Sequence, residues 1–195
     1  MENGIRLFVG LGNLGSAYSA TRHNVGAWFV ANIADSFGVS LRYETKFHGL
    51  FADVSIAGCS CKLLIPTTYM NCSGRAVQAV VNFYKIPLMQ ILVAHDELDF
   101  SAGIARLKFG GGHNGHNGLR DIISVLQDGG FHRLRLGIGR PQNKDVVNYV
   151  LGNPSSGDKE KIVTEIDKTI KLLPYLVAGE MGKAMQLLHD EHKEI

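Results

Sequence analysis

IRLFVGLGNLG, residues 5–15, is a stretch in which an apolar run ends in a cluster of glycines. Such a run predicts a buried strand that feeds a loop. From residue 25 to Gly38, apolar side chains recur at helical spacing, which predicts a helix with Asn24 as its N-cap. We therefore expect a strand, a long loop at residues 10–23 and a helix, in that order.

The same kinds of pattern recur along the rest of the chain. Short alternating runs predict an antiparallel hairpin at residues 49–57 and 61–66. Helices are expected at 73–84 and 119–126, strands at 91–94, 104–109 and 133–138, and mostly helix from about Asp145, broken near Pro154, Pro174 and Gly179. Strands that alternate with helices indicate the α/β class, and the hairpin adds antiparallel pairing. We expect a single domain over residues 1–195, folded as a three-layer α/β/α sandwich with a mixed, mostly parallel twisted sheet.

Composition excludes several classes of protein. Of the 195 residues, 45% are hydrophobic and 19% are charged, which is typical of a globular domain and too apolar for a disordered chain. The net charge of +2 is small, so any contact with nucleic acid must rest on a local patch. No apolar run approaches the roughly 20 residues that span a bilayer, and the first residues lack the features of a secretory leader. We expect a cytoplasmic protein without membrane contact.

The cysteines and histidines do not predict a metal site. The three thiols are an odd number, and Cys-x-Cys without a second pair is a poor zinc signal: Cys59, Cys61 and Cys72. His113 and His116 match no metal-binding motif, and His189 with His192 lies in a charged tail typical of a solvated helix face. We expect free thiols in a reducing compartment, no metal and no cofactor.

The glycines of residues 10–15 match the G-x-G-x-x-G pattern of dinucleotide-binding turns. That turn requires a helix that begins within the glycines, so that its N-terminal amides meet the pyrophosphate, whereas the helical pattern here begins only near Asn24. It also requires an acidic residue at the end of the next strand, and Asp35 falls inside the helical pattern instead. We expect these glycines to let the backbone and Asn13 approach a substrate closely. A nucleotide-dependent oxidoreductase is the alternative.

Histidine, asparagine and carboxylate side chains gather where the predicted strands end. They occur at Asn13 and in residues 21–24, 67–71, 95–97 and 113–117. A sandwich brings such ends to one edge, where a histidine paired with a carboxylate can act as a general base and asparagine amides can stabilise an oxyanion. Together these groups can hydrolyse an ester with plain water. A covalent nucleophile at Cys72 is disfavoured, and Ser73 is better explained as a helix cap.

Basic side chains alternate along two predicted strands. Arg106 and Lys108 share one face of the first strand, and Arg133 and Arg135 share one face of the second, because side chains at i and i+2 point to the same side. Lys144 follows soon after. From spacing alone, a phosphate clamp and an ordinary solvated sheet edge are equally compatible with this pattern.

Six segments of the chain carry the polar and glycine-rich positions described above. They are VGLGN with Tyr18 and TRHNVG (residues 9–26), PTTYMNCSG (66–74), VAHDELD (93–99), GGGHNGHNGLRDI (110–122), RLRLGIGRP (133–141) and YVLG (149–152). Together and in this order they resemble the bacterial-type peptidyl-tRNA hydrolases, along nearly the whole chain. The resemblance implies a monomeric, metal-free α/β enzyme that cleaves the ester between peptide and tRNA. Its implied partner is the acceptor stem and CCA end of peptidyl-tRNA released prematurely by ribosomes.

The resemblance also implies roles for individual residues. The general base of the family falls on His23 and its partner carboxylate on Asp96. Asn13 matches the asparagine that distinguishes an acylated amino group from a free one, and Asn71 and Asn117 match amides that hold the substrate and its water. His23 is therefore expected to take a proton from water as the water attacks the ester carbonyl, with Asp96 orienting the imidazole.

Aromatic and basic positions complete the implied site. Tyr18 and Tyr69 match positions that line the cleft, against which the terminal adenosine or the peptide can lie. Four basic residues match positions that meet the 5′-phosphate of tRNA or lie in the adjacent loop: Arg106, Lys108, Arg135 and Lys144. Charge-assisted pairs with phosphate would allow a nearly neutral protein to bind RNA.

The chain departs from the family pattern at a few positions. Leu14 and Asn114 stand where the family often has proline and glycine, and Arg106 stands where lysine is common. None of these changes affects the implied base. A non-catalytic RNA-binding module is a further alternative to an enzyme, and hydrolysis of an N-acetyl-aminoacyl-tRNA separates the two.

Overall fold

The computed structural model describes residues 4–142 and 145–190, and within them seven strands form one sheet. The strands are β1 (Leu7–Gly10), β2 (Arg42–Glu44), β3 (Gly49–Ile56), β4 (Cys59–Pro66), β5 (Ile91–Glu97), β6 (Ala105–Phe109) and β7 (His132–Gly137). Their order across the sheet is β2-β3-β4-β1-β5-β7-β6. The four central strands β4, β1, β5 and β7 run parallel, and antiparallel pairing is confined to the two edges of the sheet.

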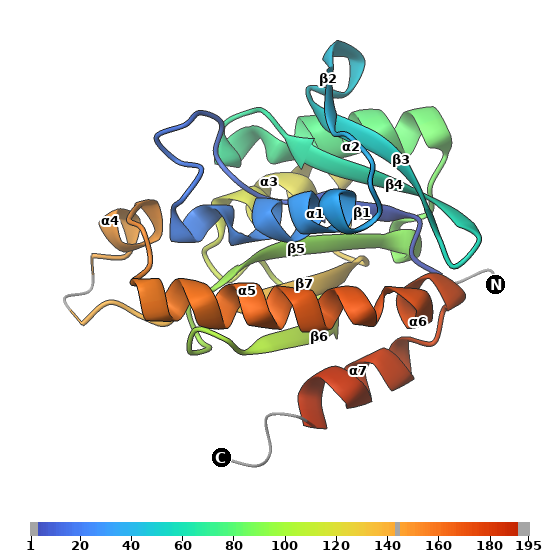
Figure 1. Ribbon diagram of the computed structural model, residues 1–195. Helices are drawn as coiled ribbons and strands as arrows, with labels where there is room; N and C mark the ends of the chain where they lie inside the picture. The colour runs from blue at the N-terminus through green and yellow to red at the C-terminus, as the bar shows by residue number, and fades with distance from the viewer. Residues whose placement is uncertain (1–3, 143–144, 191–195) are drawn as a thin grey trace.

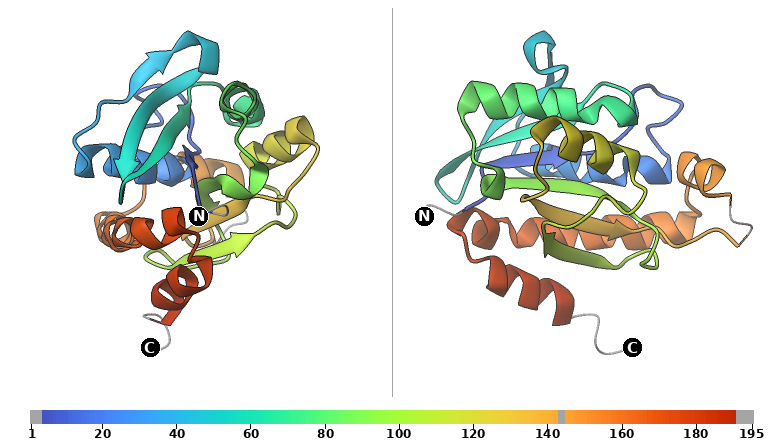
Figure 2. Two further views of the ribbon diagram at one scale, coloured as in Figure 1. Left: turned by 90° about the vertical axis from the view of Figure 1, so that its right-hand side faces the viewer. Right: turned by 180° about the vertical axis from the view of Figure 1, so that it is seen from behind.

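Helices cover both faces of this sheet, as Figure 1 shows from the front and Figure 2 from the side and from behind. In the described ranges they are α1 (Val25–Ser36), α2 (Ser73–Tyr84), α3 (Asn117–Leu126), α4 (Val146–Leu151), α5 (Ser156–Lys171), α6 (Leu173–Ala178) and α7 (Met181–Asp190), with 3-10 turns η1 (Arg22–Asn24), η2 (Thr45–Phe47), η3 (Met70–Cys72) and η4 (Leu88–Gln90). α1, α5, α6 and α7 contribute to the core on one face, and α2 and α3 to the core on the other. The predicted three-layer α/β/α sandwich with a mixed sheet is confirmed.

Alternation along the central strands builds a core on each face of the sheet. In β1, Phe8 packs in the core that contains α1, whereas Leu7 and Val9 pack in the core that contains α2 and α3. β5 is buried along its whole length, including the three polar residues at its C-terminal end, residues 95–97. In an open α/β sheet this end of the parallel strands is where ligands bind.

Glycines at the end of β1 and in the first turn of α1 allow α1 to pack closely against the sheet. A Cβ at Gly10 would lie 2.4 Å from the carbonyl oxygen of Gly26, and a Cβ at Gly26 would lie 2.2 Å from the carbonyl oxygen of Ala94. Gly15 has a φ of 107°, in the left-handed region that favours glycine. Because α1 begins only at Val25, no helix N-terminus faces these glycines in the way that a dinucleotide-binding turn requires.

Most of the predicted elements are confirmed. The hairpin is β3 and β4, in which Gly49 pairs with Pro66, and the helix expected at 73–84 is α2. The short edge strand β2 was not expected, because its three residues are exposed or half-buried and carry no alternation of apolar side chains. Among the described residues, no helix combines the length and apolarity that crossing a membrane requires.

Of the two predicted helix caps, Asn24 has the predicted position without the capping hydrogen bond, and Ser73 is wrong. Asn24 occupies the N-cap position of α1, but its side chain makes no capping hydrogen bond and pairs instead with the main chain of Asn13. Ser73 is the first residue of α2, and its hydroxyl donates to the carbonyl oxygen of Met70, 2.8 Å away. In both cases another main-chain partner competes with the helix N-terminus for a short polar side chain.

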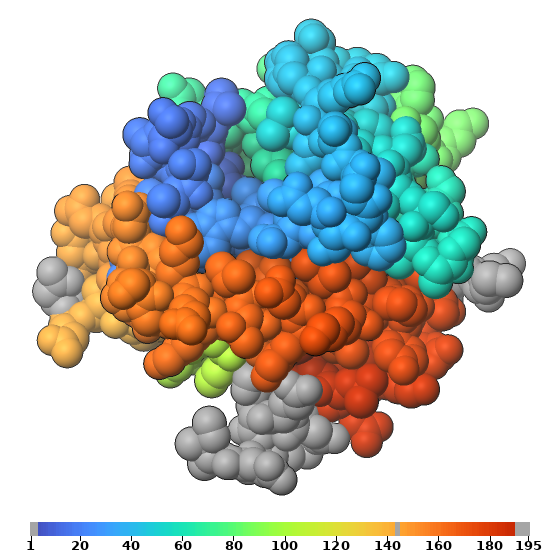
Figure 3. All heavy atoms as spheres, in the orientation of Figure 1, coloured from blue at the N-terminus to red at the C-terminus, as the bar shows by residue number. Residues whose placement is uncertain are grey.

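α4 is attached to the loop that follows β1. Arg22 donates through Nη1 to the carbonyl oxygens of Tyr149 (3.2 Å) and Gly152 (3.3 Å), at the C-terminal end of α4. Its guanidinium carbon also lies 4.1 Å from the centre of the Tyr149 ring. In Figure 3 the loop (dark blue) and α4 (light orange) meet beside α5, which crosses the face below α1. Since His23 directly follows Arg22, this contact braces the start of the site described next.

Candidate active site

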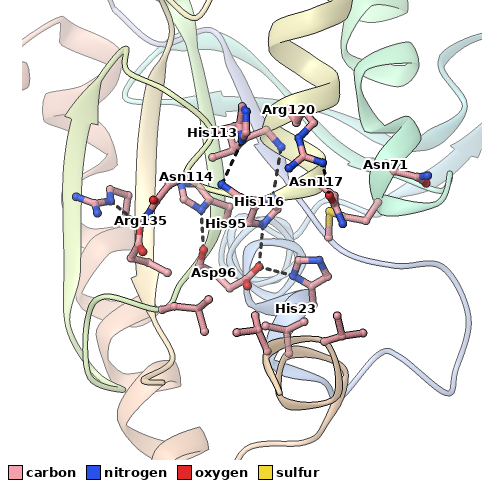
Figure 4. Close-up of a pocket in the computed structure, with 18 of the residues that line it drawn as sticks. His23, Asn71, His95, Asp96, His113, Asn114, His116, Asn117, Arg120 and Arg135 are labelled. Atoms are coloured by element: carbon pink, nitrogen blue, oxygen red, sulfur yellow. Dashed lines mark hydrogen bonds and ion pairs between the residues drawn. The ribbon is translucent and has the colours of Figure 1, made fainter. Parts of the chain in front are cut away.

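A cavity of about 950 Å³ lies at the C-terminal edge of the parallel strands. Figure 4 shows this cavity with many of its lining side chains. It brings together eight of the residues that the sequence singles out: Asn13, His23, Tyr69, Asn71, Asp96, Lys108, Asn117 and Arg135. Tyr18 and Arg106 do not line it, and Lys144 lies outside the described residues.

At the centre of this cavity, two histidines bind one carboxylate. His23 Nδ1 lies 2.7 Å from Asp96 Oδ1, and His116 Nε2 lies 2.9 Å from the same oxygen. Figure 4 shows both rings directed at Asp96, one from η1 and the other from the N-cap of α3. The side chains of His23, Asp96 and His116 are 10%, 4% and 8% exposed, so little solvent separates these charges. The fold thus brings His23 and Asp96, which come from distant parts of the chain, into direct contact.

This contact changes the pKa of both groups. Burial lowers the pKa of His23, but the charge and the hydrogen bond of Asp96 together outweigh burial, so the pKa is raised above 6.5. Burial raises the pKa of Asp96, but the interactions with His23 and His116, including a hydrogen bond from each ring, outweigh burial and hold that pKa well below its usual range. Asp96 is therefore a carboxylate at neutral pH, and it stabilises the protonated form of His23.

Hydrogen bonds also assign the tautomers of the two histidines. His116 Nδ1 accepts from the backbone N–H groups of Gly118 (3.1 Å) and Leu119 (3.3 Å), so its proton sits on Nε2 and is donated to Asp96. His23 donates its Nδ1–H to Asp96. The lone pair of His23 Nε2 is then available to accept a proton from a molecule in the cavity.

His116 is the functional residue that the sequence reasoning missed. The sequence places it among the polar residues of a glycine-rich loop, directly before a predicted helix. That position was a signal for a helix cap, which His116 is, but its second contact with Asp96 depends on the fold. No local sequence pattern predicts a hydrogen bond between the N-cap residue of α3 and β5.

His23, Asp96 and His116 also lie close enough together to share a metal ion. The hydrogen bonds of His116 oppose such binding. To offer a lone pair at Nε2, a neutral His116 would carry its proton on Nδ1, where it would face the two backbone N–H donors of Gly118 and Leu119. The arrangement therefore suits proton transfer better than metal binding.

Two asparagine amides present hydrogen-bond donors at the cavity. Asn13 Oδ1 accepts from the backbone N–H of Met70 at 3.1 Å, and Asn117 Oδ1 accepts from Arg120 Nη1 at 3.1 Å. Each amide oxygen already accepts one hydrogen bond, whereas neither Nδ2 group has a hydrogen-bond partner among the described residues and both can donate to a ligand. Such donors suit a carbonyl oxygen or an oxyanion.

The segment after β4 borders the cavity with exposed side chains. Tyr69 is 78% exposed, and Asn71 follows it in η3. Both residues line the cavity. Tyr18 is 38% exposed in the loop after β1 and stands outside the lining.

β6 and β7 place four basic residues on one face of the sheet, and we call Arg106, Lys108, Arg133 and Arg135 the basic strip. In the antiparallel register, Arg106 lies opposite Arg135 and Lys108 lies opposite Arg133. Residues directly opposite each other on antiparallel strands share a face, so the register agrees with the alternation seen in the sequence. Like charges at such close positions repel each other, and an anion placed between them would relieve that repulsion.

The members of the basic strip differ in what they already contact. Lys108 is exposed. Arg135 donates through Nε to Glu97 Oε2 at 2.8 Å, and its guanidinium carbon lies 4.4 Å from the centre of the Phe100 ring. Glu97 was not expected as a partner of the strip. It partly neutralises Arg135 and holds it in one orientation.

Arg133 anchors the glycine-rich loop from beneath. It is 3% exposed, and it donates through Nη1 to the carbonyl oxygen of Gly112 at 2.5 Å and through Nη2 to that of Gly111. The same loop continues to His116 and Asn117. Arg133 therefore supports the loop that carries two residues of the site, and it is not one of the solvent-facing charges.

His95, next to Asp96, stays neutral. Burial is the main cause that lowers the pKa of His95 to about 3, and the neighbouring His116 and Arg133 lower it further. Its Nδ1 donates to the main-chain oxygen of Asp96 at 2.7 Å, and its ring packs edge-on against His116. His95 thus supports the ring of His116 without adding a charge.

The rest of the cavity has a charged part and an apolar part. Asn114, with a φ of 45°, donates to Asp99, which also binds Arg140. Asparagine tolerates the left-handed region, so Asn114 can hold this turn without a glycine. Much of the apolar part comes from α4, which contributes Val146, Val147, Val150 and Leu151.

The fold and the site define an α/β enzyme of the hydrolase class, in which a buried histidine and carboxylate face a cavity that continues to basic side chains. Comparison with known proteins narrows this class. The family model described as peptidyl-tRNA hydrolase matches residues 7–195. The chain belongs to the peptidyl-tRNA hydrolase family, and its activity is hydrolysis of the ester bond of peptidyl-tRNA.

Individual relatives agree with this assignment. The chain is 52% identical over 190 residues to the peptidyl-tRNA hydrolase of Coxiella burnetii, covering 97% of this chain and 100% of that protein. It is 51% identical over 187 residues to that of Pectobacterium atrosepticum, covering 95% and 96% of the two chains. The crystal structure of peptidyl-tRNA hydrolase from Acinetobacter baumannii matches with a TM-score of 0.92 at 47% identity, covering 96% of this chain and 95% of that chain. The predicted family, fold class and activity are confirmed.

Proposed function

We propose that His23, oriented by Asp96, is the general base that takes a proton from water as the water attacks the ester carbonyl. The 2.7 Å contact between His23 Nδ1 and Asp96 Oδ1 carries this proposal, because it orients the imidazole and stabilises the imidazolium that forms. The proton moves to His23 Nε2 and from there to the ribose oxygen of the leaving tRNA. His116 keeps Asp96 in position through its own hydrogen bond.

The asparagine amides have a separate task in this proposal. The Nδ2 groups of Asn13 and Asn117 donate to the developing oxyanion or to a carbonyl of the peptide. A protonated α-amino group has donors only and cannot pair with Asn13 Nδ2, whereas an acylated amino group brings a carbonyl oxygen that can. This reasoning supports Asn13 as the residue that distinguishes peptidyl-tRNA from aminoacyl-tRNA. Asn71 holds the substrate at the border of the cavity.

The acceptor stem and CCA end of the tRNA are proposed to lie along the basic strip. Lys108, Arg106 and Arg135 meet the 5′-phosphate, and their shared face on β6 and β7 supports this assignment. Tyr69 and Tyr18 offer ring faces to the terminal adenosine or the peptide. Lys144 belongs to the same proposal by its place in the sequence.

A single-domain monomer in the cytoplasm, without metal or cofactor, is the form in which the protein is proposed to act. One sheet carries every strand of the described ranges, which supports a single domain over residues 1–195. The free thiols Cys59, Cys61 and Cys72 suit a reducing compartment. The tautomer of His116 supports a reaction that uses water without a metal.

Hydrolysis of N-acetyl-aminoacyl-tRNA, measured with and without a chelator, tests the reaction and the metal together. Equal rates in both conditions are expected, and loss of activity with the chelator would contradict the proposal. Cys72→Ser is expected to keep the rate, since no covalent intermediate on that thiol is involved. Titration with nicotinamide cofactors is expected to show no binding, which would exclude an oxidoreductase.

A further inference from the structure

Asn24 makes a two-point contact with the main chain of Asn13. The Asn13 N–H donates to Asn24 Oδ1 at 2.8 Å, and Asn24 Nδ2 donates to the Asn13 carbonyl oxygen at 3.0 Å. The side-chain amide of Asn24 thus pairs with Asn13 as a neighbouring strand would. Asn24 is 5% exposed, and a Cβ at Gly12 would lie only 3.0 Å from its amide carbon and nitrogen. Glycine at position 12 therefore leaves room for this contact.

The two-point contact determines where the Asn13 side chain points. Asn24 holds the main chain of Asn13, and Asn13 Oδ1 accepts from the backbone N–H of Met70 at 3.1 Å. Three hydrogen bonds therefore hold Asn13 from two sides. Within the described residues its Nδ2 group has no hydrogen-bond partner, and Asn13 lines the cavity. The Nδ2 group, with its two N–H donors, is left for a ligand, and its position depends on how Asn24 holds the main chain.

We propose that Asn24 is a positioning residue that sets the substrate selectivity of the enzyme. It aims Asn13 Nδ2 at the acyl carbonyl of the substrate, and so it strengthens the preference for an N-acylated over a free aminoacyl-tRNA. This inference rests on the role proposed for Asn13. Asn24 itself does not touch the reacting atoms, because both ends of its amide are engaged with Asn13.

The chemistry of the contact requires an asparagine at position 24. The contact needs one donor and one acceptor at the end of a short side chain. Aspartate has the same shape but only acceptors, so Asn24→Asp keeps the bond from the Asn13 N–H and sets an oxygen against the Asn13 carbonyl oxygen. Helix capping is not an alternative explanation, because the Asn24 side chain makes no capping hydrogen bond.

The test compares kcat/KM for an N-acetyl-aminoacyl-tRNA with kcat/KM for the same aminoacyl-tRNA without the acetyl group. In Asn24→Asp and Asn24→Ala, the value for the acylated substrate is expected to fall by about tenfold, the effect of one or two misaligned hydrogen bonds. The value for the free aminoacyl-tRNA is expected to change little, so the ratio of the two values falls with it. In Asn24→Ala the pH at which the rate is half-maximal should not move, since His23 and Asp96 are untouched and no charge is added beside them.

A matched control lies on α1, the helix that Asn24 precedes. Asn32 donates through Nδ2 to the carbonyl oxygen of Trp28 at 2.8 Å, away from the cavity. Asn32→Ala also removes one bond between an asparagine side chain and the main chain, and it is expected to leave the selectivity ratio unchanged. The comparison separates a loss of selectivity from a general loss of stability in α1.

A double-mutant cycle with Asn13→Ala decides whether Asn24 acts through Asn13. Without the Asn13 side chain, Asn24 has no substrate-facing amide to position, so adding Asn24→Ala to Asn13→Ala should lower kcat/KM by less than about twofold. A full tenfold loss in that background would overturn the inference. So would an unchanged ratio in Asn24→Asp, or the failure of both single variants to fold, which would make the contact a requirement of the fold. A wild-type protein that shows no preference for the acylated substrate would instead contradict the role proposed for Asn13.

Discussion

The charged groups of the histidine–carboxylate centre are buried, whereas most of those in the basic strip reach solvent. The Asp96 side chain is 4% exposed and bound by two imidazoles, whereas Lys108 is exposed and Arg135 reaches solvent beside its partner Glu97. Salt screens exposed charges strongly and buried pairs weakly. The chemical step should therefore respond to pH and little to salt, and tRNA binding should respond to salt and little to pH.

Removal of His23 is expected to cause the largest fall in activity. This fall should come from the chemical step alone and not from tRNA binding. His23→Ala should lower kcat by about 10²–10⁴-fold, the usual contribution of a general base, and should leave KM for tRNA nearly unchanged because the basic strip is intact. Steady-state hydrolysis of N-acetyl-aminoacyl-tRNA measures both constants. His132→Ala, on β7 and outside the cavity lining, is the matched control. Near-normal turnover by His23→Ala would remove His23 from the mechanism.

Replacement of Asp96 by a neutral group is expected to cause the second-largest fall in kcat. Asp96→Asn should lower kcat by about 10²-fold, because an amide stabilises an imidazolium less well than a carboxylate does and can favour the wrong tautomer of His23. Binding of uncleaved peptidyl-tRNA, measured by filter retention, should stay within about twofold of normal. Weaker binding with an unchanged rate constant would assign Asp96 to substrate binding.

His116 offers a way to separate its two contacts. His116→Asn keeps a good N-cap residue for α3 but cannot reach Asp96, whereas His116→Ala loses both contacts. We expect kcat to fall by about tenfold in both variants, because Asp96 loses a charge-assisted hydrogen bond, and only His116→Ala to lose about 1 kcal/mol more stability. Full kcat in His116→Asn would show that Asp96 does not depend on His116.

Substitutions in the basic strip should change the salt dependence of tRNA binding and leave the chemical step unchanged. Lys108→Ala and Arg106→Ala are each expected to raise KM several-fold and to lower the slope of log KM against log salt by roughly 0.7–0.9, the value for one phosphate contact. kcat at saturating substrate should be unchanged. Lys171→Ala, at the exposed end of α5 on the other face, serves as the control. Salt slopes equal to that of the wild type would show that these side chains do not meet phosphate.

His95 should affect stability more than activity. Its pKa in the folded protein is about 3, below the ordinary 6.5, so between these values the unfolded chain binds a proton that the folded protein excludes. The free energy of unfolding should therefore fall as the pH falls below 6.5, by about 1.4 kcal/mol per pH unit for this group. His95→Gln should lose that part of the slope in urea unfolding between about pH 4.5 and 6.5. An unchanged slope would show that His95 titrates normally.

The sequence alone predicts the elements whose pattern depends on neighbouring residues. The apolar run of β1 and the helical spacing of residues 73–84 predict the observed elements, because both depend on side chains a few positions apart. The family resemblance selected His23 and Asp96 from many polar residues, and the fold brings them together. Their contact lay beyond any spacing rule, since the two residues are far apart in the sequence.

The sequence alone does not predict burial, or hydrogen bonds to residues that only the fold brings close. Period-2 alternation places Arg133 and Arg135 on one face but says nothing of depth, and only Arg133 proves to be buried under the glycine-rich loop. An asparagine side chain can either cap a helix N-terminus or pair with a nearby main chain, and the sequence at Asn24 predicts the cap. The main chain of Asn13 lies close enough that Asn24 pairs with it instead. His116 depends in the same way on a strand end elsewhere in the sequence.

The pH dependence of kcat/KM for N-acetyl-aminoacyl-tRNA, compared between the wild type and Asp96→Asn, tests the central claim most directly. The raised pKa of His23 in the wild type places the midpoint of the rise in rate above pH 6.5, since the base must be unprotonated to act. Without the carboxylate, burial alone governs His23, so the midpoint in Asp96→Asn should move to lower pH while the plateau falls. Equal midpoints in the two proteins would contradict the account.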